Sequence, residues 1–189
     1  MREKIISILK EKNTMSIDID TLAKRLSIKN KSELMNELTT LVEEGILDYS
    51  ERKKKYLLFE NSHLIKAVIG PTNSEGITLA TANGEKYYIL KKNLKGATYG
   101  DIVSLDVDSN SNGIVVRILK RDASNYVGEV VVRNNVLYVY DKRLGFINIP
   151  SNSAYVEGQK VLIRHENGKN EIIDIIGHKD DPGIDIKSI

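Results

Sequence analysis

The sequence predicts a multidomain α+β protein in which a small helical unit is followed by two five-stranded β-barrels. Three observations support this fold class. Apolar residues follow a helical spacing up to about residue 45, short strands separated by turn residues come next, and the strand pattern after residue 62 occurs twice. With 189 residues, the chain is long enough for two or three such units.

Three helices are expected in the first 45 residues. The first covers residues 1–12, where isoleucine and leucine form an amphipathic stripe. Asp18 is placed to cap a short second helix and Ser32 to cap a third, because their side-chain oxygens can accept a hydrogen bond from a free backbone N–H. Gly45 follows the third helix and is expected to end it, since glycine easily adopts the left-handed conformation found there.

A charged hairpin is predicted after these helices. Residues 46–49 and 56–59 read as two strands, and the turn between them carries Arg52, Lys53, Lys54 and Lys55. Three helices followed by a hairpin with a basic tip are typical of a winged helix, which we expect over residues 1–62. Winged helices bind DNA, RNA or proteins, so this order of elements leaves the function open.

Two OB-type barrels are predicted next, over residues 63–122 and 123–178. Five short strands bounded by turn residues is the number found in a small Greek-key barrel. Gly100 precedes the fourth strand of the first set and Gly158 that of the second, which indicates that one plan is used twice. The expected strands are 66–69, 76–80, 86–90, 102–107 and 113–119, then 127–132, 136–140, 145–149, 159–164 and 171–176.

Composition argues against several classes of site. The chain has no cysteine, which excludes disulfides and zinc–thiolate centres and fits a reducing cytoplasm, where we expect the protein. It has no apolar run that would span a membrane and no signal peptide, so no membrane partner is expected. No glycine-rich phosphate loop opens a helix, and His63, His165 and His178 have no catalytic neighbour at a motif spacing. We expect no catalytic residue, metal ion or other cofactor in this chain.

An acidic stretch near the end of the sequence needs separate mention. His178, Asp180, Asp181 and Asp185 lie close together, and clustered carboxylates can hold Mg²⁺. The same stretch contains a Pro-Gly turn, and we favour the interpretation that residues 179–189 begin an acidic linker.

Nucleic-acid binding is better supported than catalysis. The net charge of +2 decides little, but basic residues collect at the expected turns and barrel rims. Small barrels bind single strands by combining such charges with exposed aromatic faces, although the same rings could simply fill the barrels. Of the neighbours Tyr87 and Tyr88, one should face outward. The candidate RNA-binding residues are Arg52, Lys53, Lys54, Lys86, Tyr87, Tyr88, Lys91, Lys92, Arg121, Tyr138, Tyr140, Lys142, Arg143 and Phe146.

Two stretches resemble the ribonuclease II and R exoribonuclease family. Residues 91–103, KKNLKGATYGDIV, are similar to the family's N-L-x-G-A-x-x-G-D-x-V step. Residues 176–186, IGHKDDPGIDI, resemble the segment that joins its second barrel to its catalytic domain. The order of units over all 189 residues also matches the family's N-terminal region, a winged helix followed by two cold-shock-type OB barrels.

The resemblance implies that the parent enzyme degrades RNA processively from 3′ to 5′, and that this region guides single-stranded or partly structured RNA inward. The family's catalytic domain, which holds Mg²⁺, would follow Ile189, so this chain would bind RNA without hydrolysing it. In one respect the chain departs from the family. Where each barrel commonly has a Gly-Phe-Gly-Phe type strand, residues 75–79 read EGITL and residues 135–139 read NVLYV, so the first barrel lacks those stacking rings.

Two other functions remain open. A stand-alone winged-helix regulator would bind DNA, but the third helix carries Glu33, Glu37 and Glu44 and few cations, which suits a major groove poorly. A protein-interaction module would instead contact a partner protein through the winged helix.

Overall fold

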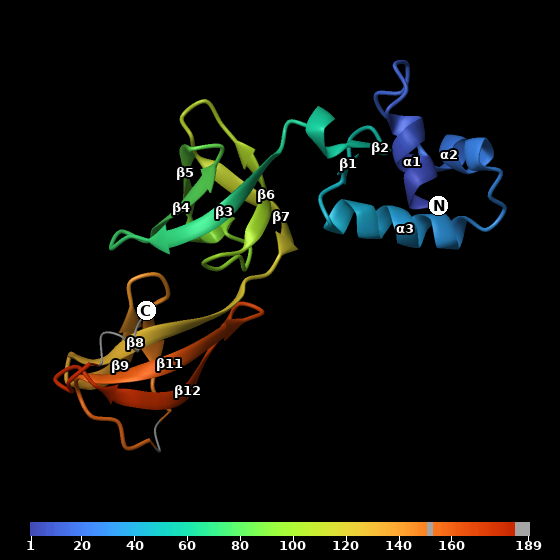
Figure 1. Cartoon of the computed structure of the whole chain (residues 1–189). Coiled ribbons are helices and arrows are strands. Elements are labelled where there is room, and N and C mark those ends of the chain that lie inside the picture. Colours follow the sequence, from blue (N-terminus) through green and yellow to red (C-terminus); the bar gives the residue numbers. More distant parts are fainter. Residues whose placement is uncertain (151–152, 184–189) are drawn as a thin grey trace.

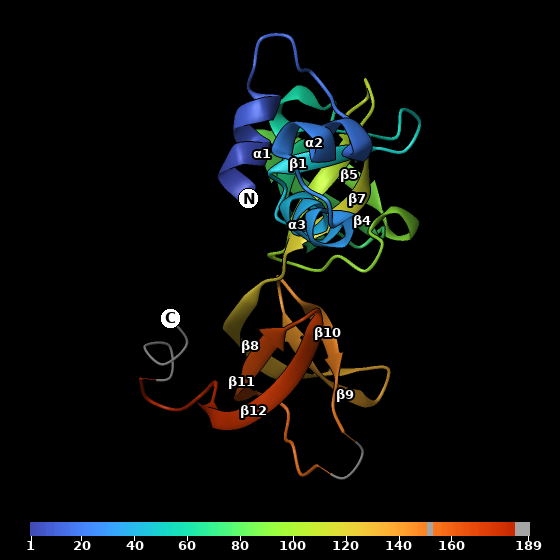
Figure 2. The ribbon, with the colours of Figure 1, turned by 90° about the vertical axis from the view of Figure 1, so that its right-hand side faces the viewer.

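The computed structural model describes residues 1–150 and 153–183. The chain forms a helical unit, then a first five-stranded antiparallel sheet, then a second one. The first sheet lies between the other two units (Figure 1). In the view turned by 90°, the second sheet lies below the rest of the molecule (Figure 2). Each unit has its own cluster of buried apolar side chains. Among the described residues, no helix is both long and apolar enough to cross a membrane. The expected small helices and two five-stranded sheets are confirmed, while the unit boundaries stay predictions.

The helical unit packs three helices against a two-stranded hairpin. Leu22, Leu34 and Leu38 lie fully buried between them. Ile17, between the first two helices, forms an isolated antiparallel bridge with Tyr56 of the hairpin, which adds a short third pairing to its edge. The elements are α1 (Arg2–Leu9), α2 (Ile19–Leu26), α3 (Lys31–Glu43), β1 (Leu47–Ser50), β2 (Lys55–Leu58) and the short η1 (Phe59–Asn61).

The helix ends test the capping predictions. The Asp18 carboxylate accepts a hydrogen bond from the Thr21 N–H at 2.8 Å, so its capping role is confirmed. The cap at Ser32 is wrong: Asn30 caps α3 and accepts from the Ser32 N–H, because the helix already begins at Lys31. Gly45 does end α3, with a φ of +67°.

The first helix is shorter than residues 1–12. It ends at Leu9, and turns lead the chain back toward Ile17, whose backbone N–H and C=O both bond to Tyr56. This pairing with the hairpin requires the helix to stop early. Propensity alone, which would allow another turn, therefore does not decide its end.

The first sheet has the strand order β5-β4-β3-β6-β7. The two edges of the sheet meet where Tyr88 of β5 forms an isolated parallel bridge with Asn112, just before β7, and the Tyr88 N–H donates to the Ser111 carbonyl at 2.9 Å. This order and closure are consistent with an OB-type barrel, which we call the first barrel. Its elements are β3 (Ile65–Thr72), β4 (Ile77–Ala82), β5 (Glu85–Leu90), η2 (Lys91–Asn93), β6 (Ile102–Val107) and β7 (Gly113–Lys120).

The second sheet, which we call the second barrel, repeats this plan. Its order is β10-β9-β8-β11-β12, which has the same connections as the first and is likewise consistent with the OB type. Gly100 and Gly158 occupy equivalent positions before the fourth strands, with φ values of +84° and +86°, as the sequence repeat predicts. The strands are β8 (Ala123–Arg133), β9 (Val136–Asp141), β10 (Gly145–Asn148), β11 (Gln159–Glu166) and β12 (Lys169–His178).

Strand β8 begins at Ala123, four residues before the expected start at residue 127. The reason lies in its partner: β11 is long enough for Glu166 to pair with Ala123. This extension brings the start of the second barrel up to the end of the first.

Candidate nucleic-acid interface

Three aromatic rings gather on the outer face of the second barrel. Tyr140 of β9 lies directly opposite Phe146 of β10, and their ring centroids are 4.9 Å apart. Tyr138 is two residues along on the same face, with its ring centroid 5.9 Å from that of Phe146. Tyr140 and Phe146 are 41% and 47% exposed, far more than rings that fill a core. The three side chains share one face and form an open surface that we call the aromatic platform.

A guanidinium group lies against this platform. The Cζ atom of Arg133, at the end of β8, is 4.7 Å from the centroid of the Phe146 ring, which is cation–π distance. On the other side, exposed Asn148 lies opposite Tyr138 in the sheet and so shares its face. The platform thus combines flat ring faces with one positive charge and one carboxamide.

The acidic neighbour of the platform is neutralised. Glu129 of β8 lies directly opposite Tyr140, but its carboxylate forms an ion pair with Lys160 of β11 at 2.8 Å. An approaching phosphate therefore meets a balanced pair there, together with the positive charge of Arg133. Lys142, in the turn after β9, is exposed.

The first barrel offers a smaller surface on β5. Tyr88 is the outward-facing member of its pair, at 47% exposure, as the alternation along the strand predicts. Tyr87 is half-buried against the core, and its hydroxyl donates to Glu85 at 2.7 Å. Lys86 shares the outer face with Tyr88. Among the residues that the structure describes, no other ring pairs with Tyr88, so this barrel has no counterpart of the platform.

The remaining predicted lysines lie on turns. Lys91 and Lys92 are exposed in η2, directly after β5. Arg52, Lys53 and Lys54 are exposed at the tip of the β1–β2 hairpin, where the Lys54 ammonium group pairs with Glu51 at 2.9 Å. The structure thus distributes the candidate residues over the hairpin tip, β5 with η2, and the second barrel.

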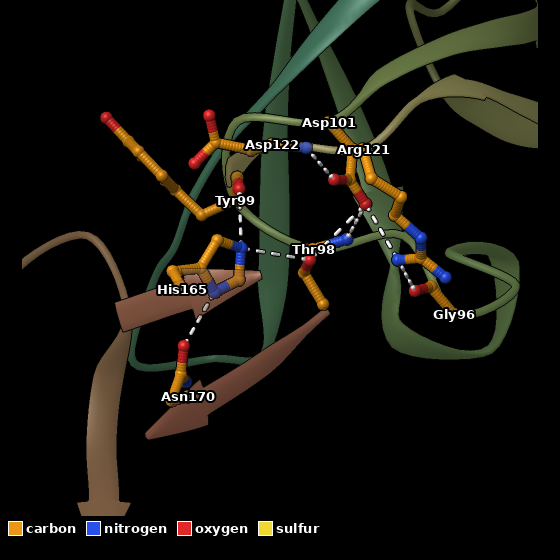
Figure 3. A network of polar contacts seen from close by, with 8 residues as sticks. All are labelled: Gly96, Thr98, Tyr99, Asp101, Arg121, Asp122, His165 and Asn170. Carbon is orange, nitrogen blue, oxygen red and sulfur yellow. Dashed lines mark hydrogen bonds and ion pairs between the residues drawn. The ribbon is translucent and has the colours of Figure 1, made fainter. Parts of the chain in front are cut away.

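Two of the predicted arginines form ion pairs with buried carboxylates near the place where the barrels meet. Arg121, in the segment between β7 and β8, forms an ion pair with the fully buried Asp101 at 2.9 Å and donates to the Gly96 carbonyl at 2.8 Å (Figure 3). The other Asp101 oxygen accepts from the Asp122 N–H at 2.9 Å. The connecting segment is therefore fastened to the loop that precedes β6.

His165 of β11 reaches the same loop from the second barrel. It is 1% exposed, and its Nε2 atom lies 3.1 Å from the Tyr99 carbonyl oxygen and 3.3 Å from the Thr98 hydroxyl (Figure 3). A carbonyl oxygen can only accept, so Nε2 donates to the Tyr99 carbonyl. The other ring nitrogen, Nδ1, lies 2.6 Å from the Asn170 side chain on β12.

Arg143 lies near the same contact, on the second barrel. Its guanidinium pairs with Asp141 at 2.7 Å and lies 4.4 Å from the centroid of the Tyr126 ring. Burial alone would raise the pKa of Asp141, but hydrogen bonds from the Arg143 side chain and from the Arg143 and Leu144 backbone N–H groups outweigh it, and the pKa stays below its ordinary value. Burial, together with a hydrogen bond to Asp122, raises the pKa of Tyr126 to about 12. Phosphate contacts by Arg121 and Arg143 stay predictions.

The acidic stretch lies partly outside the described residues, which exclude Asp185. Asp181 accepts a hydrogen bond from the His178 backbone N–H at 2.7 Å, as in a tight turn. Within residues 1–150 and 153–183, no three histidine or acidic side chains are grouped to hold a metal ion.

A curated protein is similar to this chain in sequence. The chain is 29% identical over 180 residues to Ribonuclease R of Ureaplasma parvum serovar 3, an alignment that covers 85% of this chain. The chain resembles ribonuclease R. This confirms the resemblance that residues 91–103 and 176–186 indicate. The chain spans about a quarter of the length of that relative, since the alignment covers 25% of it. No family model matches the sequence.

Solved structures of ribonuclease R also align with this chain. RNase R of Mycoplasma genitalium, in complex with ribose-methylated single-stranded RNA, aligns with a TM-score of 0.39 and 21% identity, over 65% of this chain and 23% of its own. The apo form of the same enzyme gives the same TM-score and identity, over 66% of this chain.

Sequence reasoning missed four residues that stand out in the structure. Arg133 and Asn148 complete the platform, while Asp101 and His165 fasten the two barrels together. The alternation along β8 and β10 could have placed Arg133 and Asn148 on the outer face. No local signal identifies His165 as a contact with the first barrel, because its partners Thr98 and Tyr99 lie more than sixty residues earlier.

Proposed function

We propose that this chain is an RNA-binding region of a ribonuclease R-like 3′→5′ exoribonuclease, and that it guides single-stranded or partly structured RNA toward a catalytic domain. The observation that carries this proposal is the aromatic platform with Arg133 at its side. The sequence relative named ribonuclease R supports the assignment to RNA degradation. Such an enzyme would act in the cytoplasm.

The chemistry of the platform suits single strands. Every base has a flat face that can stack on Tyr140 or Phe146, and such stacking contributes about 1–3 kcal/mol per base. A guanidinium beside the rings supplies a positive charge for the phosphate that follows the stacked base. Bases within a duplex are already stacked on one another, so the platform favours unpaired segments.

The other units have supporting roles in this proposal. Tyr88 and the lysines at 86, 91 and 92 provide a weaker surface on the first barrel. Residues 1–62 form a winged helix whose exposed hairpin tip contacts RNA phosphates. The antiparallel bridge between Ile17 and Tyr56 supports this classification. It adds a short third strand-like segment beside the β1–β2 hairpin, next to the three helices.

The platform can be tested with a double variant, Tyr140→Ala with Phe146→Ala. We expect it to weaken binding of a single-stranded RNA of about ten nucleotides by at least tenfold, since two stacking surfaces are removed. Fluorescence anisotropy at two salt concentrations measures this. Val132→Ala is the matched control, because Val132 is an equally exposed apolar residue at the end of β8, at 47%.

Two results would contradict the proposal. If the double variant bound RNA as tightly as Val132→Ala, the platform would not be the binding surface. If the protein bound duplex DNA more tightly than single-stranded RNA, a DNA-binding regulator would be the better assignment.

The catalytic part of the proposal is tested separately. Mg²⁺ would be held by the catalytic domain and not by this chain. An Asp-rich catalytic segment in frame after the codon for Ile189 would support the parent enzyme, and a different domain there would contradict it.

A further inference from the structure

We infer that Asp101 and His165 are positioning residues that hold the two barrels at one fixed angle, so that a single RNA strand can contact both at once. That one RNA strand contacts both barrels rests on the proposed function. The polar network that joins the barrels, made of Thr98, Asp101, Arg121, Asp122 and His165, is called the joint below (Figure 3).

The joint couples the connecting segment to both barrels. On one side, Asp101 receives hydrogen bonds from the Thr98 N–H, the Arg121 guanidinium and the Asp122 N–H, all at 2.9 Å. On the other side, the Tyr126 hydroxyl at the start of the second barrel donates to Asp122 at 2.8 Å. The two residues between β7 and β8 are therefore bound at both ends and cannot act as a free hinge.

His165 gives the joint a second attachment point. It lies on β11, whereas the connecting segment leads into β8, so the barrels are fastened at two separate places in the chain. Thr98 links the two places, because its hydroxyl lies 3.3 Å from both the Asp101 carboxylate and His165 Nε2. Two attachments restrict rotation between barrels far more than one.

Close backbone approach confirms that the surfaces meet at the joint. A Cβ atom on Gly100, which has a φ of +84°, would lie 2.6 Å from the Asp122 side chain. A Cβ atom on Gly168, in the turn between β11 and β12, would lie 2.9 Å from the Arg121 guanidinium. Both distances are shorter than real Cβ contacts, so a larger residue at either position would force the Asp122 carboxylate or the Arg121 guanidinium to shift.

Besides these polar contacts, the barrels touch through the edge-to-face pair of the Tyr99 and Tyr126 rings, whose centroids are 5.9 Å apart. A cavity of about 200 Å³ remains between the barrels, lined by residues of both, including Leu94, Ala97 and Leu144. Because this space is left open, side chains around it are not packed against one another and add little resistance to a rotation. Removing one strong polar contact is therefore expected to loosen the angle.

A fixed angle matters for a strand that spans both barrels. When one barrel holds the RNA, the second contact becomes intramolecular, and its strength depends on the effective concentration of the second surface. Free rotation would spread that surface over many positions and lower this concentration. A short RNA that reaches one barrel would not be affected.

The angle can be measured directly, because the chain contains no cysteine. Thr81→Cys on β4 and Ile173→Cys on β12 place one spin label on each barrel at exposed positions. We expect a narrow distance distribution by pulsed electron paramagnetic resonance in the parent protein, and a broad one after His165→Ala. His165→Gln should restore the narrow distribution, since its amide N–H can reach the Tyr99 carbonyl. His63→Ala is the matched control, because its side chain is 73% exposed on the first barrel.

RNA affinity provides the second measurement. For His165→Ala we expect roughly tenfold weaker binding of a twenty-nucleotide RNA and unchanged binding of a five-nucleotide RNA, since one OB-type barrel holds about 4–16 nucleotides. Tyr126→Phe, which keeps the ring and loses the bond to Asp122, tests the joint if His165→Ala does not fold.

The outcomes separate the joint from the proposed function. An unchanged distance distribution in both His165→Ala and Tyr126→Phe would overturn the joint. If His165→Ala lost the same amount of affinity for short and long RNA, the joint would have only a structural role and no positioning role. If the parent protein bound no RNA, the proposed function would fail, and with it the positioning role, while the distance distributions would still decide whether the joint fixes the angle.

Discussion

Replacing Asp101 by asparagine tests the energetic importance of the joint. The substitution keeps the shape of the side chain but exchanges one carboxylate oxygen for an NH₂ group. One oxygen accepts from the Thr98 N–H and the other from the Asp122 N–H, so either orientation of the amide leaves one backbone donor facing another donor. The ion pair with Arg121 is also lost.

The cost follows from these contacts. A buried backbone donor without a partner costs about 1–3 kcal/mol, and charge-assisted hydrogen bonds lose about half their strength when the charge is removed. Arg121 is one third exposed and regains water, so its contribution is small. We expect Asp101→Asn to destabilise the first barrel by about 2–4 kcal/mol.

Native-state hydrogen exchange at the buried strand β6 measures this. The amides of Val103 and Leu105 should exchange roughly 30- to 700-fold faster in the variant, as that range of free energy requires. Asp106→Asn is the matched control, because Asp106 lies on β6 itself and its side chain is 48% exposed. It should change the free energy of unfolding by less than about 0.5 kcal/mol. If both variants exchanged at the same rate, Asp101 would not stabilise the barrel and the reasoning would be refuted.

Three further predictions concern pH and salt. The pKa of Tyr126 is raised to about 12, so its protonated hydroxyl stabilises the fold fully below about pH 10. This contribution is lost as the pH rises to about 12. Tyr126→Phe should not show this loss in alkaline denaturation curves. The pKa of Asp141 is lowered, so its ionised form stabilises the fold above its ordinary pKa. The difference in unfolding free energy between the parent and Asp141→Asn should therefore shrink in urea titrations as the pH falls below about 4. A constant difference would exclude a contribution from its pairing with Arg143. Reversing the charge of Lys91 and Lys92 should lower the salt slope of RNA binding by about 1.4, at roughly 0.7 per phosphate, and an unchanged slope and affinity would rule out these lysines as contacts.

Local patterns predicted much of the fold. The Asp18 cap and the Gly45 end of α3 follow from the side chain or the backbone freedom of a single residue, so the sequence showed them directly. The repeated strand pattern likewise predicted two sheets of the same plan. Predictions were less accurate where a distant partner sets the boundary, as at the end of α1 and at the start of β8, because propensity does not include tertiary pairing.

The candidate site divides in the same way. Alternation along a strand is a local property, so the sequence could place Tyr138 and Tyr140 on one face. That Phe146 lies directly opposite Tyr140 came from the structure. The sequence could not show that Arg121 points inward to Asp101, because a basic residue in a short connecting segment reads as a solvated rim residue.

The sequence by itself determined the order of the units, the absence of cysteine and the resemblance to the ribonuclease II and R family. These follow from residue types and from their spacing along the chain. Only the tertiary structure decided which charges are free and which fasten the barrels, and that Arg133 lies against Phe146. The physical reason is that a side chain's role depends on the groups that surround it, and at the joint those groups come from loops and strands more than sixty residues apart.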